Sequence, residues 1–380
     1  MHPLPHPAFA LLLMAGSLHA AVPPRPAPPP KSLDVVVMPA GQASLSQARS
    51  QPEYWRAQSA MPTFKQLPAS AFDYNAAAAI GRTVTQASET GHPGGLDATG
   101  LAVRVAEPAP VQDAQHEALG LVAPAAVGTQ GLHFTSSAVH PAQADTSFPL
   151  RATGKLWFEK VPGSGQWSVR SGTMIKPGIV VTAGHCVASG SGSWYGSFQF
   201  APGYRNGAAP YGIWTSWATA TTTDQWFTGG GGVPNAGDYA LLVFNRNGSG
   251  YRIGDYTGWL GYQYPSLVGR HVTVLGYPNN LDSGSVNHRI DSQTTAGANG
   301  TGLWGSDMSG GSSGGAVVLN LRASYASSTA TPSENNANRL VSVVSYGSTA
   351  TGPMYQGGSV FDSRLGTMLS NMCTSFAWAC

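Results

Sequence analysis

Short apolar runs, separated by glycine-rich turns, dominate the chain after about residue 150. Within these runs Val, Ile, Leu, Phe and Tyr recur over four to eight residues, which is typical of β-strands. Their number and spacing predict a sandwich or barrels. The predicted strands cover residues 155–158, 168–175, 179–183, 197–200, 239–244, 271–275, 316–319, 340–345 and 359–361.

A helix is predicted near the C-terminus, over residues 362–370. Asp362 can accept hydrogen bonds from the free amides at its start. Leu365, Met368 and Leu369 share one face at helical spacing, so we expect the helix to pack on the outside of the strands.

Composition divides the chain between about residues 130 and 150. Nineteen of the 28 prolines lie at or before Pro149, and the segment before the division is otherwise rich in Ala, Gln and Ser. Proline-rich sequence favours extended, irregular chain without a core. We therefore predict a propeptide or linker over residues 22–135 and a folded domain over residues 136–380.

The first residues contain an apolar run, 8–16, that ends near small residues at Ala20 and Ala21. This pattern predicts a secretory signal peptide over residues 1–21 and hence an extracellular protein. The alternative is a disordered apolar start. No other run approaches the ~18 apolar residues that a membrane span requires, so no membrane association is expected.

Charge and cysteine content narrow the possible partners. Charged residues make up 10% of the chain and the net charge is +2, without Lys or Arg clusters, so we expect no nucleic-acid partner.

The three cysteines lack the paired short spacings of a zinc site, and we expect neither a metal nor a cofactor. Cys373 and Cys380 can close a small loop, which leaves Cys186 as a buried free thiol.

The segment Gly310–Gly315, with the sequence GGSSGG, precedes a predicted apolar strand. Glycines around Ser313 allow a tight turn in which the amides of Gly311 and Ser313 converge on a developing oxyanion, as acyl transfer requires. Glycine–serine turns are common, however, and by itself the segment is equally compatible with a plain linker.

A possible general base follows another predicted strand. His185 comes directly after the run 179–183 and a small-residue turn. A neutral imidazole there can accept the serine proton if a carboxylate fixes its tautomer. Asp238 lies at the start of an apolar strand and can supply that carboxylate, although a lone aspartate there is more often a turn residue. The order His185, Asp238, Ser313 predicts a catalytic triad.

These segments, TAGHC at 182–186, GDYALL at 237–242 and GGSSGG at 310–315, resemble the chymotrypsin/trypsin superfamily of serine proteases. PGYRNG at 202–207 and PYG at 210–212 are similar to the bacterial glutamyl endopeptidase branch. The resemblance covers residues 135–380. It implies an all-β fold of two antiparallel six-stranded β-barrels with a C-terminal helix. A largely irregular pro-segment is expected to precede this fold, and the protein is expected to be a monomer after the pro-segment is removed.

The resemblance also implies roles for further residues. Ser345 is expected to support the catalytic aspartate, and Ser345, Tyr346 and Gly347 to line the substrate channel. Two positions depart from the family pattern. Ser312 replaces an aspartate that pairs with the new N-terminus in trypsin-like enzymes, and Arg170 replaces the usual cysteine partner of Cys186.

Two features of the expected specificity pocket disagree. Asp307 occupies the place where trypsin-like enzymes bind Arg or Lys, and an acid there favours a cationic side chain. The branch resemblance favours cleavage after Glu, yet Val344 stands where that branch usually has a histidine. Asp307 is also compatible with an ordinary surface loop. Both specificities stay open.

The sequence thus predicts a secreted serine endopeptidase that hydrolyses peptide bonds in proteins or peptides. The alternative is a non-catalytic binding protein on the same scaffold, because a fold can be kept when its catalytic activity is lost. A serine esterase of another fold would show G-x-S-x-G with its acid and histidine after the serine, whereas here His185 comes first.

Overall fold

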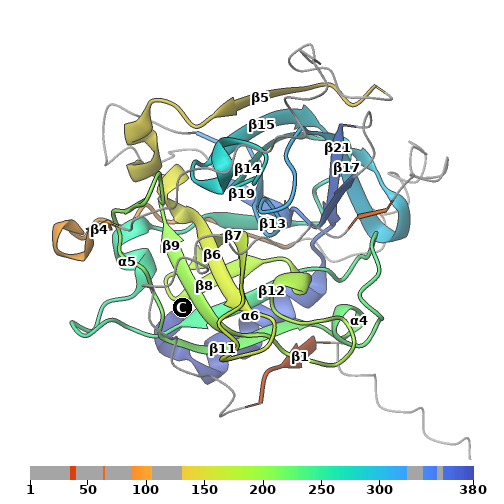
Figure 1. Cartoon of the computed structure of the whole chain (residues 1–380). Helices are drawn as coiled ribbons and strands as arrows, with labels where there is room; N and C mark the ends of the chain where they lie inside the picture. Colours follow the sequence, from red (N-terminus) through yellow and green to blue (C-terminus); the bar gives the residue numbers. More distant parts are fainter. Residues whose placement is uncertain (1–34, 40–62, 65–86, 105–130, 323–336, 349–353) are drawn as a thin grey trace, which may run out of the picture. The chain divides into compact units, whose positions relative to one another are not determined.

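β-Strands make up most of the regular structure. The structure is a computed structural model that describes residues 35–39, 63–64, 87–104, 131–322, 337–348 and 354–380 (Figure 1). The predicted signal peptide, residues 1–21, lies outside these residues.

The first half of the fold is an antiparallel sheet of seven strands. Six strands come from residues 153–244 and the seventh from the N-terminal segment. Several strands are buried along their whole length, because the sheet curls around its own apolar side chains. In sheet order they are β1 (Val35–Val37), β11 (Trp217–Thr223), β12 (Ala240–Phe244), β8 (Ile179–Thr182), β7 (Trp167–Lys176), β6 (Thr153–Glu159) and β9 (Gly196–Pro202).

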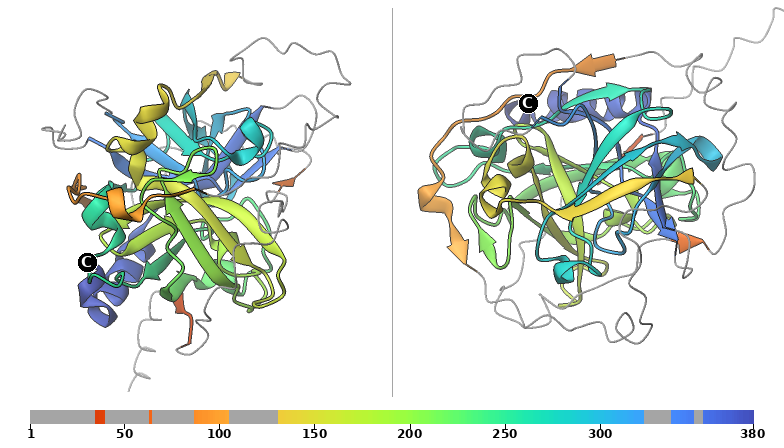
Figure 2. Two further views of the ribbon diagram at one scale, coloured as in Figure 1. Left: turned by 60° about the vertical axis from the view of Figure 1, so that its left-hand side comes forward. Right: turned by 90° about the horizontal axis from the view of Figure 1, so that it is seen from above.

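The second half contains a seven-stranded and a five-stranded sheet. In order, the larger sheet is β3 (Ala87–Glu89), β13 (Gly261–Tyr264), β19 (Arg339–Val343), β18 (Ala316–Leu319), β14 (His271–Gly276), β15 (His288–Gln293) and β5 (Phe134–Ala138). The smaller is β16 (Thr295–Ala296), β17 (Thr301–Gly305), β21 (Tyr355–Ser359), β20 (Tyr346–Ser348) and β2 (Thr63–Phe64). Figure 2 (left) shows the teal and blue strands of this half above the yellow-green strands of the first.

The α-helices in the described part of the chain are few and short. They are α4 (Asp224–Phe227), α5 (Ile253–Thr257) and the C-terminal α6 (Ser363–Ser375). Asp362 caps α6 as predicted, since its carboxylate accepts a hydrogen bond from the Arg364 amide at 2.9 Å. The buried face of α6 contacts β1, β11 and β12, so the end of the chain packs on the first half.

The predicted all-β fold with a C-terminal helix is confirmed, and the strands group into two curled halves. The predicted strand 359–361 overlaps β21 only at Ser359, because the strand occupies the preceding residues 355–359. The helix extends to Ser375, five residues beyond its predicted end.

Short strands also occur in the segment predicted to be largely irregular. β1, β2 and β3 each add to the edge of a sheet, and β4 (Val103–Arg104) pairs with β10 (Ala208–Ala209). Their residues lack a clear apolar alternation, so backbone hydrogen bonds to an existing edge, and not local pattern, create these strands.

Candidate functional site

Strand pairing brings His185 and Asp238 together. β8 and β12 pair antiparallel, with Thr182 opposite Ala240, so the end of β8 lies beside the start of β12. His185 follows β8 in a single 3₁₀ turn, and Asp238 lies two residues before β12. The sheet therefore places an imidazole and a carboxylate at the same edge.

The two side chains form a closely fitted, buried pair. Nδ1 of His185 lies 2.8 Å from Oδ2 of Asp238, and the His185 amide donates to Oδ1 at 2.8 Å. The hydroxyl of Ser345 donates to Oδ2 of Asp238 at 2.5 Å. Asp238 and Ser345 are fully buried. Three hydrogen bonds thus hold the carboxylate in place and direct it at the ring.

The preceding glycine is required by this packing. A Cβ atom on Gly184 would lie 2.7 Å from the Trp226 ring and 3.0 Å from Oδ1 of Asp238. Any side chain there would separate the histidine turn from the carboxylate.

The carboxylate raises the basicity of the imidazole. Burial alone lowers the pKa of His185, but the negative charge of Asp238, with contributions from Cys186 and the hydrogen bond to Asp238, outweighs burial and raises the pKa to about 9. The pair therefore favours the imidazolium that forms when the ring accepts a proton.

Ser313 lies beside the strand that leads to His185. Its carbonyl accepts a hydrogen bond from the Ser171 amide at 2.9 Å. A Cβ atom on the next residue, Gly314, would lie 2.0 Å from Oγ1 of Thr182, and its φ of +78° also favours glycine. This close approach brings the serine loop of the second half against the end of β8.

The structure does not join Ser313 to His185 by a hydrogen bond. Oγ of Ser313 and Nε2 of His185 are both buried and, within the described part of the chain, have no hydrogen-bond partner. The predicted nucleophile and base thus each retain an unused polar atom, whereas the His185–Asp238–Ser345 part of the predicted site is hydrogen-bonded throughout.

The predicted oxyanion amides are fixed through the carbonyls of their own peptide planes. The Gly310 carbonyl accepts from the Asn279 amide at 2.7 Å, and the Ser312 carbonyl accepts from the Gly315 amide at 2.8 Å. Because the peptide group is planar, the N–H groups of Gly311 and Ser313 point the opposite way. Neither donates a hydrogen bond to any described residue.

Ser171 connects this loop to the first half and was not identified from the sequence. Its hydroxyl donates to the Gly311 carbonyl at 2.9 Å and accepts from the Tyr277 amide at 2.9 Å. Gly311 has a φ of +97°, and a Cβ atom there would lie 2.4 Å from the Tyr277 carbonyl. The loop therefore depends on a glycine at this position and on a serine from β7.

Part of the chain is similar to known proteases. Residues 170–323 match the family model described as a trypsin-like peptidase domain. The chain is 34% identical over 144 residues to the glutamyl endopeptidase of Bacillus licheniformis, covering 37% of this chain and 40% of that protein. This part of the chain therefore resembles a trypsin-like peptidase domain.

A second curated relative is named as a different class of protease. The chain is 32% identical over 144 residues to a Bacillus subtilis protein named extracellular metalloprotease, covering 35% of this chain and 40% of that protein. The chain thus spans about 40% of the length of both curated relatives.

Two solved structures are also similar to the chain. The protease Anisep of Arthrobacter nicotinovorans has 26% identity and a TM-score of 0.49 over 59% of this chain and 96% of that chain. The thermostable serine protease AL20 has 23% identity and a TM-score of 0.48 over 62% of this chain and 99% of that chain.

The residues predicted to bind substrate occupy two regions of the second half of the fold. Ser345, Tyr346 and Gly347 follow β19, and the Tyr346 ring is buried with its hydroxyl 2.8 Å from that of Thr301. The Tyr346 side chain therefore packs inside the second half, and the backbone of this segment pairs with β21 and β2. Asp307 is partly exposed and its Oδ1 accepts from the Ser136 hydroxyl at 2.8 Å.

Ser312 and Arg170, the two residues that depart from the family pattern, both form hydrogen bonds. Ser312 is buried, and its hydroxyl donates to the Ser309 carbonyl at 2.7 Å. Arg170 is buried and donates to the Val169 carbonyl at 2.6 Å. Cys186 is a buried free thiol, and the predicted bond between Cys373 and Cys380 is present.

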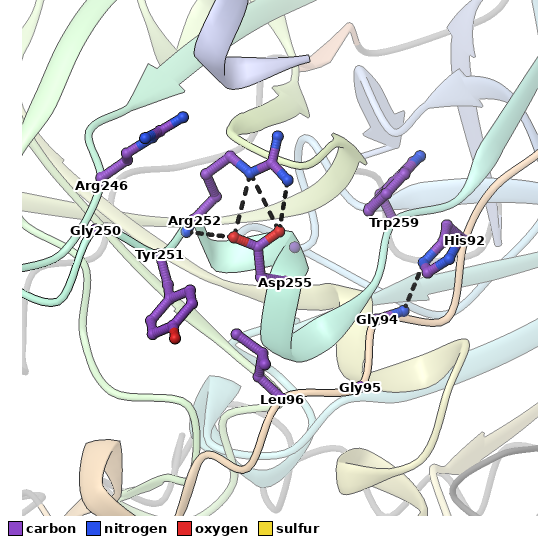
Figure 3. A pocket seen from close by; sticks show the side chains of 11 residues that line it. His92, Gly94, Gly95, Leu96, Arg246, Gly250, Tyr251, Arg252, Asp255 and Trp259 are labelled. Atoms are coloured by element: carbon purple, nitrogen blue, oxygen red, sulfur yellow. Dashed lines mark hydrogen bonds and ion pairs between the residues drawn. The ribbon is translucent and has the colours of Figure 1, made fainter.

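Surface hollows also occur among the described residues, away from the predicted site. One, of about 690 Å³, lies between residues 92–96 and the segment that contains α5 (Figure 3). Two of its polar side chains are already paired, since Arg252 binds Asp255 and the His92 ring accepts from the Gly94 amide. Among the described residues no cluster of three or more His, Cys, Asp or Glu side chains could hold a metal ion.

Proposed function

We propose that the chain is a serine endopeptidase with His185, Asp238 and Ser313 as its catalytic triad. One observation carries the proposal: the buried His185–Asp238–Ser345 relay lies against a loop that presents a buried serine hydroxyl and two unpaired amides. These features support the proposed roles of base, orienting carboxylate, nucleophile and oxyanion donors.

In the proposed mechanism, Oγ of Ser313 attacks the carbonyl carbon of the scissile bond while Nε2 of His185 accepts its proton. The amides of Gly311 and Ser313 bind the oxyanion. The imidazolium then protonates the leaving amine, which gives an acyl-enzyme. Water, deprotonated by the same imidazole, hydrolyses the ester and restores Ser313. Asp238 remains ionised and holds the ring in place.

The substrates are proposed to be proteins or peptides. Their backbone would lie along Ser345–Gly347, as the resemblance implies. Specificity stays open between Arg or Lys, through Asp307, and Glu, as in the relative named glutamyl endopeptidase. Asp307→Asn separates the two: it weakens cleavage after Arg and Lys if Asp307 binds the substrate cation, and a peptide-library profile measures this.

Ser313→Ala tests the chemistry. We expect it to abolish casein cleavage and labelling by a fluorophosphonate while the circular dichroism spectrum is unchanged. Ser191→Ala, in another glycine–serine turn, is the matched control and keeps full labelling. EDTA should have no effect, which separates this chemistry from that of the relative named a metalloprotease.

Labelling that survives Ser313→Ala would overturn the proposed nucleophile. Absence of cleavage and labelling in the processed wild-type protein would instead favour the alternative, a non-catalytic binding protein on this scaffold.

We further propose that the protein is secreted, that residues 1–21 are a signal peptide and that residues 22–135 are removed on maturation to give a monomer. Within the described residues no helix is long and apolar enough to cross a membrane. The parallel pairing of β2 with β20, at the predicted substrate channel, supports latency of the precursor.

The maturation site can be narrowed. A cut before residue 136 would divide β5, whereas a cut within residues 105–130 would leave that strand intact. N-terminal sequencing of the active protein identifies the site, and mass photometry measures its oligomeric state.

A further inference from the structure

A buried amide side chain lies beneath the serine loop. Gln356 is the second residue of β21, and its backbone pairs with Trp304 of β17 and Gly347 of β20. The side chain is fully buried. An amide removed from water is destabilising unless its donors and acceptor are satisfied, so its contacts define what it does there.

All these contacts are with the segment that leads to the nucleophile. Nε2 of Gln356 donates to Oγ of Ser312 at 2.8 Å and to the carbonyl of Met308 at 3.1 Å. Oε1 accepts from the Ser306 hydroxyl at 2.9 Å. The Ser306 hydroxyl also accepts from the Met308 amide at 3.1 Å. One side chain thus connects three residues of the stretch 306–312.

Ser312 connects this network to the reacting groups. Its hydroxyl accepts from Gln356 and donates to the Ser309 carbonyl, so it is held from two sides. Ser312 lies between Gly311 and Ser313, whose amides are the proposed oxyanion donors. A rotation about the backbone bonds of Ser312 would turn the 312–313 peptide plane, which carries the Ser313 amide, and would displace the adjoining residue Gly311.

We propose that Gln356 is a positioning residue, which through Ser312 fixes the loop 309–313 in the geometry that binds the oxyanion. The proposal rests on the proposed function. Gln356 contacts the loop from the side of β21, while Ser171 holds the carbonyls on the other side. An uncharged amide can do this in a fully buried place at a lower desolvation cost than a carboxylate.

The test compares Gln356→Leu with the wild type on a peptide nitroanilide chosen from the library profile. We expect kcat to fall about tenfold to a hundredfold with KM within twofold, because the loop contributes mainly in the transition state. Affinity for the matching peptide boronic acid, whose adduct places an oxygen near the amides, should fall by a similar factor. A role in folding alone would not separate kcat from KM.

Matched variants make the result specific. Gln263→Leu removes another strand glutamine that donates to a serine hydroxyl, that of Ser266 at 3.0 Å, and should leave kcat unchanged. Ser312→Ala should reproduce the loss of kcat, and the double variant with Gln356→Leu should lose little more than the larger single effect.

Two outcomes would overturn the proposal: an unchanged kcat in folded Gln356→Leu, or fully additive effects of Gln356→Leu and Ser312→Ala. If Gln356→Leu does not fold, Gln356→Glu and Ser312→Ala decide the question by the same split between kcat and KM. Ser313→Ala is measured in the same series. If it retains labelling, the proposed function fails; if it loses labelling while Gln356 variants keep kcat, only the positioning role fails.

Discussion

The pH dependence of activity follows from the His185–Asp238 pair. Its Nδ1–Oδ2 distance is 2.8 Å, and the pKa of His185 is raised from 6.5 to about 9, with burial opposing and the Asp238 charge favouring the rise. Each pKa unit is worth about 1.4 kcal/mol, so the raised pKa corresponds to roughly 3 kcal/mol of preferential stabilisation of the imidazolium. Only the neutral ring can accept the serine proton.

We therefore expect kcat/KM to rise tenfold per pH unit up to about pH 9 and to level off above it. At pH 7 about 1% of the ring is neutral if the pKa is about 9, so the rate should be about a hundredfold below the plateau. The second-order rate of inactivation by diisopropyl fluorophosphate, measured from pH 5 to pH 10.5, reports this titration without knowledge of the preferred peptide.

The raised pKa of His185 also makes the free energy of unfolding depend on pH. A histidine whose pKa is higher in the folded state stabilises the fold fully below its unfolded pKa of 6.5, and this contribution is lost as the pH rises through about 9. Urea unfolding at pH 6 and pH 9.5 should therefore give a smaller wild-type free energy of unfolding at pH 9.5. The difference between the two pH values should shrink in Asp238→Asn.

Asp238→Asn provides the direct test. Without the negative charge, burial lowers the pKa of His185, and the histidine resonance observed by NMR should titrate at lower pH. Asp282→Asn is the matched control, because Asp282 lies 2.8 Å from Nε2 of another histidine, His288. A wild-type inflection at or below pH 6.5, or equal effects of the two substitutions, would refute the argument.

Other substitutions test the surroundings of the site. Ser345→Ala should lower kcat/KM about tenfold, since a hydrogen bond to a carboxylate contributes about 1.5–3 kcal/mol, whereas Ser342→Ala, from the preceding strand, should have little effect in the same assay. Gly311→Ala should lower labelling at least a hundredfold, because its φ of +97° and the nearby backbone exclude a methyl group. Replacing Cys373 and Cys380 by serine should lower the free energy of unfolding in urea by about 2 kcal/mol, as expected for a short closed loop.

The sequence predicted the residues at strand ends and, through the resemblance, the support that Ser345 gives to Asp238. It did not predict Ser171 or Gln356. His185, Asp238 and Ser313 each stand next to an apolar run, where the change from strand to turn is visible. Ser171 lies inside β7 and Gln356 inside the glycine-rich β21, where a polar residue has no local signal of its partner. Their roles arise from pairing between distant strands, which neither periodicity nor composition contains.

The N-terminal segment illustrates the same limit. Its composition predicts an irregular chain, and β3 (sequence ASE) has no apolar alternation. It becomes a strand because β13 offers an unpaired edge, and because Glu89 binds Lys176 and the hydroxyl of Tyr262. Tertiary context therefore decides the structure where local propensity is weak.

The site depends on hydrogen bonds that cross between the two halves of the fold. The Asp238 carboxylate precedes β12 of the first half, yet Ser345 of the second half donates to it. The Ser313 carbonyl belongs to the second half, yet the Ser171 amide of the first half donates to it. Each half thus fixes a proposed reacting group of the other, so a small relative shift would disturb the proposed base and oxyanion amides together. In the proposed mechanism, packing between the halves therefore contributes to the chemistry as well as to stability.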